Sequence, residues 1–231
     1  KIPIYAVFCA AFFKKYQALV MIGLYITGIV LGIIIALILK NTAFRGKPVP
    51  FVMELPNYRL PSAKSVGLLL WDKAKDFIQR AFTVIFFATI IIWFLETFDA
   101  KLNVVKDSSD SLLALIGQAI SPIFKPLGFA DWRVTTSLIS GFTAKEAVVS
   151  TMAVLMNTST ANLGTALSGA FSTLSALSFL VFTLLYTPCV AAVATIKREL
   201  DSRIQTVGVV IMQCMVAWLC GCAVYQIGAL L

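Results

Sequence analysis

Apolar residues along this chain form runs long enough to cross a membrane, and charged segments separate these runs. The clearest run extends from Ala18 to Leu39 without a charge, with lysines on both sides. Because about 20 apolar helical residues span the hydrocarbon layer of a bilayer, this run predicts a transmembrane helix. Further spans are predicted from about Ala81 to Phe98 and from Val207 to Leu231. The pattern therefore indicates an all-α, polytopic membrane protein.

The charged segments between these runs indicate the orientation of the chain. Residues 40–80 hold eight basic residues against three acidic ones, which the positive-inside tendency places in the cytoplasm. The first half of this segment is rich in proline, whereas 62–80 is amphipathic and predicts a helix along the membrane surface. Residues 99–133 have balanced charge and are expected outside, while the basic cluster at 197–203 is expected in the cytoplasm.

Two apolar segments, 134–156 and 174–196, lie between the outside segment and the cytoplasmic cluster. A chain that passes from outside to the cytoplasm must cross the membrane an odd number of times, so the two segments cannot both be single crossings. One of them must therefore enter the membrane and return. The better candidate for a re-entrant hairpin is 134–156, because residues 140–143 can form a tip between two short half-helices. In an alternative topology Leu112–Ile120 dips into the membrane as well, which changes the count.

These segments predict three parts of the chain. Residues 1–39 form an N-terminal amphipathic segment with the first transmembrane helix, and 40–80 form the cytoplasmic basic segment. Residues 81–231 form a membrane domain, which contains the hairpin at 134–156, a proline-broken helix at 174–196 and the last helix at 207–231.

Composition narrows the function further. Of 231 residues, 59% are hydrophobic and 13% are charged, about half the charge of a soluble domain, which excludes an ordinary soluble enzyme. Histidine is absent from the sequence, so the commonest general base and metal ligand are excluded. The net charge of +8 follows from the topology, and nucleic acid is not an expected partner. The odd number of cysteines favours free thiols: Cys9, Cys189, Cys214, Cys220 and Cys222.

Lys145 and Glu146 are the only charged residues between Val134 and Ile196. Ionisable residues inside a membrane are costly and face protein, water or a ligand. On a helix that starts near the hairpin tip, Thr143, Glu146 and Ser150 would form an oxygen-bearing stripe able to replace part of a cation's hydration shell. Two interpretations remain open: a cation pathway, or a wet hairpin tip at which Lys145 and Glu146 merely satisfy one another or the backbone.

Thr187, Pro188 and Cys189 form the second constellation of interest. A proline inside a helix lacks the backbone N–H and breaks the helix, and the negative end of the first half-helix favours cations. The Cys189 thiol beside this break is a soft ligand suited to a transition metal. A simple proline kink with a small buried cysteine explains the same residues. The cysteines of the last helix have no assigned role, since packing between helices explains them equally well.

Three stretches together resemble the membrane half of the ferrous iron transport protein B (FeoB) family, and the resemblance extends over essentially the whole chain. They are Pro50–Pro61 (PFVMELPNYRLP), Ser140–Thr151 (SGFTAKEAVVST) and Leu185–Glu199 (LYTPCVAAVATIKRE). The family resemblance implies two gate segments similar to those of nucleoside transporters with re-entrant hairpins. It also implies Fe²⁺ uptake into a bacterial cytoplasm, with Cys189 and Glu146 as metal-binding residues and Thr143, Lys145, Ser150, Thr187 and Pro188 along the pathway.

The resemblance also implies the protein's surroundings. These are a bacterial inner membrane, a GTP-binding domain in the same protein or in a separate chain, small accessory proteins of the iron uptake system, and a second copy of the chain as a candidate homo-oligomer partner. The sequence has no phosphate-binding loop motif, so any GTPase activity is expected in another domain and the chain itself is expected to be no enzyme. We expect a C-terminal fragment or one subunit of a split system, in which Lys1–Tyr5 is the trailing edge of the first gate.

Two other functions compete with iron transport at this point. The chain can be a non-conducting membrane scaffold that docks a cytoplasmic GTPase through residues 40–80. It can also transport a nucleoside-like solute, which follows from the shared gate architecture alone. Metal-dependent stabilisation distinguishes these alternatives from an iron transporter.

Overall fold

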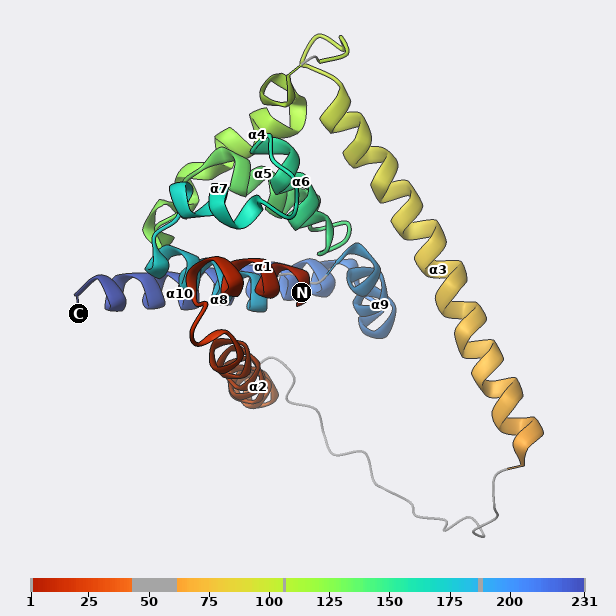
Figure 1. The fold of residues 1–231 in the computed structure, drawn as a ribbon. Helices are drawn as coiled ribbons and strands as arrows, with labels where there is room; N and C mark the ends of the chain where they lie inside the picture. Colours follow the sequence, from red (N-terminus) through yellow and green to blue (C-terminus); the bar gives the residue numbers. More distant parts are fainter. Residues whose placement is uncertain (1, 43–61, 106, 187–188, 231) are drawn as a thin grey trace.

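The computed structural model describes residues 2–42, 62–105, 107–186 and 189–230, and it is helical throughout most of these ranges (Figure 1). The all-α prediction is confirmed. The candidate site residues Thr187 and Pro188 lie outside the described residues, and so does the whole stretch 43–61 with its family-like motif.

Two helices in the described ranges are long and apolar enough to cross a membrane. They are α2 (Gln17–Asn41) and α10 (Arg203–Leu230). Most large apolar side chains of α2 are exposed, as expected for a helix that faces lipid. The predicted spans at 18–39 and 207–231 correspond to these helices.

The third long helix, α3 (Ala63–Thr97), is continuous where the sequence predicted a boundary. Ser62 caps it, because its side-chain oxygen accepts a hydrogen bond from the backbone N–H of Ser65. The predicted surface helix at 62–80 and the predicted span from Ala81 are therefore one helix, and a helix end near residue 80 was wrong. The first half of α3 carries charged residues and the second half is largely apolar, but no proline interrupts either half, so the helix continues.

The remaining helices are short and form a packed body beside the long ones (Figure 1). α8 packs most extensively on α10, α1 lies against α7 and α8, and α2 contacts α8. The bounds of these shorter elements are α1 Ile2–Phe12, η1 Ser108–Asp110, α4 Leu112–Ile120, η2 Ser121–Leu127, α5 Trp132–Ser140, α6 Ala147–Leu155, α7 Leu163–Ala170, α8 Thr173–Leu185 and α9 Val190–Leu200.

The predicted hairpin is present as α5 and α6, which pack on each other across the turn at 141–146. α4 also belongs to this region: the stretch Leu112–Leu127 and α5 are two apolar arms bent by 106°. A second bent pair joins α7 and α8 at 109°. The alternative in which Leu112–Ile120 enters the membrane together with the hairpin is therefore compatible with the packing of α4 on α5.

Stacked phenylalanines hold the short helices together. The Phe8 and Phe179 ring centroids lie 4.7 Å apart, and Phe129 meets Phe179 edge-on at 5.3 Å. Phe171 contacts all three of these rings. These four side chains are at most 5% exposed. Their packing holds α8 in place against the neighbouring segments.

Candidate cation site at the break between α8 and α9

α8 ends at Leu185 and α9 begins at Val190, and the two described residues between them, Tyr186 and Cys189, are not helical. Tyr186 follows α8 in an extended conformation, with φ −64° and ψ 164°. Cys189 precedes α9 in a similar conformation, with φ −60° and ψ 161°. The prediction of a broken helix is thus confirmed. The Cys189 thiol follows shortly after the carbonyl end of α8, which carries the negative end of the helix dipole.

Lys145, from the turn between α5 and α6, reaches this break. Its ammonium donates a hydrogen bond to the Tyr186 carbonyl at 3.2 Å and lies 3.8 Å from the centroid of the Tyr186 ring. The lysine side chain is only 8% exposed. A carbonyl oxygen at a helix C-terminus and the face of an aromatic ring both attract cations, so the end of α8 is a place where positive charge is stabilised.

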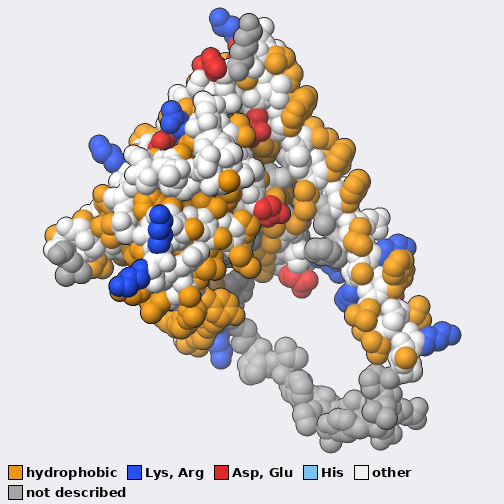
Figure 2. Space-filling view, in the orientation of Figure 1, with side chains coloured by type: hydrophobic (Ala, Val, Ile, Leu, Met, Phe, Trp, Pro, Cys, Tyr) orange, Lys and Arg blue, Asp and Glu red, His pale blue; other side chains and the backbone are white. Residues whose placement is uncertain are grey.

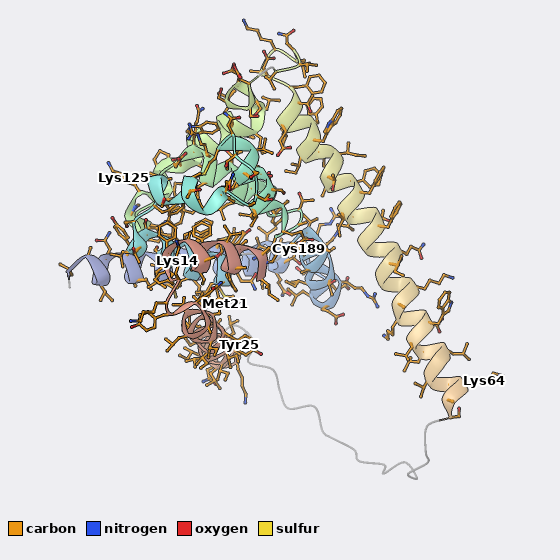
Figure 3. The ribbon with its side chains drawn as sticks, viewed as in Figure 1. Lys14, Met21, Tyr25, Lys64, Lys125 and Cys189 are labelled. Atoms are coloured by element: carbon orange, nitrogen blue, oxygen red, sulfur yellow. The ribbon has the colours of Figure 1, made fainter. Side chains whose placement is uncertain are left out.

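A cavity of about 790 Å³ opens beside this contact, between α2, α8 and α10. We call it the central cavity. Lys145, Tyr186 and Cys189 line it together, with Tyr25 from α2 and Gln213 from α10. Figure 3 marks Cys189 at the start of α9 and Tyr25 on α2. The cavity is large enough for an ion that keeps part of its water shell.

Cys189 also lines a second cavity, of about 740 Å³, which lies between α3, α9 and α10. We call it the α9 cavity. Its lining includes Ile85, Thr195, Glu199 and Val209. Cys189 and Val209 belong to both cavities, so the thiol lies where the two spaces meet.

The hairpin tip is fixed directly to the broken helix. The backbone N–H of Val190 donates a hydrogen bond to the Phe142 carbonyl at 2.9 Å. Gly141 lies so close to its neighbours that a β-carbon there would be 2.1 Å from Val148 and 3.0 Å from the Tyr186 hydroxyl oxygen. A movement of the tip relative to α8 must therefore change the position of Lys145 relative to Tyr186.

The predicted oxygen stripe is wrong. α6 begins only at Ala147, with Glu146 at its N-cap position, so Thr143 lies in the turn and shares no helical face with Ser150. Thr143 is buried, whereas the Glu146 and Ser150 side chains are exposed. The stripe assumed a helix from the tip onward, but the turns at 141–146 intervene. Lys145 donates to the backbone carbonyl of Tyr186, which is compatible with the interpretation in which Lys145 and Glu146 satisfy one another or the backbone.

Among the described residues, no three His, Cys, Asp or Glu side chains come together as a metal cluster. A cation at the break would therefore rely on a mixed set of donors. The Tyr186 carbonyl belongs to the carbonyl end of the broken helix that the sequence already favoured for cations, whereas the Gln213 amide on α10 was not predicted. A glutamine near the middle of an apolar span was the available signal for Gln213, because such a polar group needs a partner in the membrane.

Two family descriptions match parts of this chain. Residues 78–203 match the family described as "Gate: Nucleoside recognition", and residues 21–73 match "Ferrous iron transport protein B C terminus". The first match contains the hairpin, Lys145, the α8–α9 break and Cys189. No solved structure gives a significant match.

Curated relatives match along most or all of the chain. The chain is 36% identical to an Fe(2+) transporter FeoB of Staphylococcus aureus, over 100% of this chain and 34% of that protein. It is 36% identical to an Fe(2+) transporter FeoB of Methanocaldococcus jannaschii, over 87% of this chain and 31% of that protein. A Porphyromonas gingivalis protein described as a fusion of Fe(2+) transport protein A and the FeoB transporter is 32% identical over 100% of this chain and 33% of that protein. The chain thus spans about a third of the length of these relatives.

Proposed function

Because this chain belongs to the ferrous iron transport protein B family, as its C-terminal membrane region, we propose that it moves Fe²⁺ across a bacterial inner membrane through the break between α8 and α9. The relatives named as Fe(2+) transporters support the cargo. The exposed apolar side chains of α2 and α10 support the location in a membrane. Transport depends in this proposal on a GTP-binding domain that is not in this sequence, and this chain itself catalyses no reaction.

One observation carries the proposal: Cys189 lies where the central cavity and the α9 cavity meet. Fe²⁺ that reaches the central cavity exchanges water for the Cys189 sulfur and the Tyr186 carbonyl oxygen. The thiol gives its proton to water when it binds the metal. Thiolate and carbonyl donors together suit a borderline transition metal better than Mg²⁺ or Ca²⁺, which prefer oxygen alone.

The α9 cavity supplies the continuation of this route. Thr195 and Glu199 line it, next to the basic segment 197–203 that we expect in the cytoplasm. A carboxylate at this end attracts a divalent cation away from the thiol. Glu146 and Ser150 are exposed at the hairpin and are assigned to the approach to the site, while Thr143, Thr187 and Pro188 keep their proposed place along the pathway.

Several partners belong to the same proposal. The fusion named in Porphyromonas gingivalis supports a small accessory protein that acts with the transporter. The relatives are about three times as long as this chain, which leaves room for a GTP-binding domain in the whole protein. A second copy of the chain is a further candidate partner through the exposed apolar faces of α2 and α3.

Replacement of Cys189 by serine in the transporter that carries this chain tests the proposal. Uptake of radioactive Fe²⁺ is expected to fall at least about tenfold at equal membrane expression, because a neutral hydroxyl replaces the thiolate ligand. Cys222→Ser is the matched control, since Cys222 is a partly buried cysteine on α10 outside the lining of both cavities. Normal uptake by the Cys189→Ser protein would remove the thiol from the pathway.

The description of the gate family as nucleoside recognition favours one other function, transport of a nucleoside-like solute. Thermal unfolding of the purified transporter separates the two. Fe²⁺ or Co²⁺ is expected to raise the unfolding temperature and uridine to leave it unchanged. The scaffold alternative predicts that the purified protein retains no metal. It also predicts that the GTP-binding domain still binds when Glu146 and Cys189 are both replaced.

A further inference from the structure

Lys145 places a buried positive charge directly on groups that attract cations. Its ammonium is 3.2 Å from the Tyr186 carbonyl oxygen and 3.8 Å from the ring centroid, and the residue is 8% exposed. A buried ammonium is expensive unless its surroundings stabilise the charge. The end of α8 is therefore already a cation position, and in this structure a side chain of the protein occupies it.

Gln213 adds an independent observation in the same cavity. Its Oε1 atom is buried and accepts no hydrogen bond from any described residue, although Gln213 lines the central cavity with Lys145 and Cys189. A buried amide oxygen without a donor is costly in an apolar membrane helix. An amide oxygen is also a good ligand for a metal ion, so a cation in this cavity would satisfy it.

Building on the proposed function, we propose that the Lys145 ammonium is a tethered placeholder for the transported divalent cation. It holds the position at the Tyr186 carbonyl while the site carries no metal. The metal binds there when the ammonium withdraws, and Cys189 and Gln213 then complete its protein ligands. Lys145 lies in the turn 141–146, outside α5 and α6, and has a flexible four-carbon stem, so its ammonium can withdraw without unfolding of either helix.

Charge explains what the placeholder achieves. Na⁺ or K⁺ brings the same single charge as the ammonium and gains little by displacing it, whereas a divalent ion brings twice the charge to the same donors. The two cations cannot share the position, because positive charges a few ångströms apart repel strongly in a site of low dielectric constant. Lys145 thus makes the site selective for divalent ions and weakens their binding at rest.

Removal of the lysine charge tests this inference. Co²⁺ titrated into the purified transporter gives a sulfur-to-metal charge-transfer absorption when a cysteine thiolate binds it. Lys145→Met is expected to lower the Co²⁺ concentration for half-maximal absorption about tenfold or more, because the competing charge is gone. Lys145→Gln, which keeps a polar side chain, should shift it in the same direction. Lys145→Arg keeps the charge and should bind Co²⁺ no more tightly than the unaltered protein.

The same Co²⁺ titration tests Gln213 as the second ligand and can contradict the inference. Gln213→Leu should raise the half-maximal Co²⁺ concentration about tenfold through loss of one oxygen ligand. If Cys189→Ser removes the absorption but both neutral variants of Lys145 bind Co²⁺ unchanged or more weakly, the placeholder is contradicted while the proposed function stands. If the absorption persists in Cys189→Ser, the proposed site itself fails.

Discussion

At the scale of single residues, the hairpin tip depends on a glycine. A β-carbon at Gly141 would meet Val148 at 2.1 Å and the Tyr186 hydroxyl at 3.0 Å. We predict that Gly141→Ala destabilises the protein by about 1 to 3 kcal/mol through overpacking, and that it also slows iron uptake because the Lys145 turn shifts. Thermal unfolding in detergent and uptake assays measure both effects. Gly169→Ala is the control, since nothing lies within 4 Å of a β-carbon there.

The sequence identified some site residues better than others. Lys145 was evident as a charge in a long apolar region, and Cys189 as a thiol beside a proline. The carbonyl end of α8 was expected from the proline, but the contact between Lys145 and the Tyr186 carbonyl was not, because the two residues are 41 positions apart. The sequence placed Lys145 and Glu146 together at the pathway, but adjacent residues in a turn point in different directions. Lys145 is buried, whereas Glu146 is exposed.

At the scale of helices, α8 and α10 are joined by a small residue and one polar contact. The Ser178 hydroxyl donates a hydrogen bond to the Gly221 carbonyl at 2.8 Å, and a β-carbon at Gly221 would lie 3.5 Å from Phe182 of α8 and 2.9 Å from Leu127 of η2. Close backbone approach at small residues is a common way to pack membrane helices. This contact holds α10, and Gln213 with it, against the helix that ends at the cation site.

We predict that Ser178→Ala costs about 0.6 kcal/mol, the typical value of a hydrogen bond between membrane helices. Gly221→Ala should cost more, about 1 to 3 kcal/mol, because Leu127 has to move. Gly208→Ala on the same helix is the control, since a β-carbon there meets nothing within 4 Å. Unfolding in mixed micelles ranks the three variants. Equal stability of Gly221→Ala and Gly208→Ala would contradict the packing described here.

The helices themselves were largely predictable, but their ends and pairings were less so. Runs of apolar residues identified α2 and α10, since length and hydropathy decide a span. The continuity of α3 was missed because hydropathy changes near residue 80 while nothing in the backbone stops the helix. The 106° bend between the Leu112–Leu127 stretch and α5 was also missed, because tertiary packing sets such angles.

At the scale of the whole molecule, α3 is long enough to extend from the membrane into water. Its 35 residues are about 52 Å long, which exceeds the roughly 30 Å of hydrocarbon. Apolar side chains cover the exposed face of α3, and lysines appear toward its N-terminal end (Figure 2). The N-terminal part should therefore extend into water on the cytoplasmic side.

Labelling of single introduced cysteines tests this orientation. A membrane-impermeant maleimide should modify Lys73→Cys in inside-out vesicles and not in right-side-out vesicles. Phe87→Cys lies in the apolar half of α3, with its native side chain 62% exposed toward the lipid, and should stay unlabelled in both. Labelling of Lys73→Cys from outside would reverse the assigned topology and the direction of the route past Cys189.

The most direct test of the cation route is the alkylation rate of Cys189 in the transporter, followed by mass spectrometry of the peptide that contains it. Fe²⁺ under anaerobic conditions should slow this reaction several-fold, and Mg²⁺ should not, because the metal binds the thiolate that the reagent attacks. The rate at Cys222 should stay constant as an internal reference. An alkylation rate at Cys189 that is unaffected by Fe²⁺, in protein that still takes up iron, would contradict a route through the α8–α9 break.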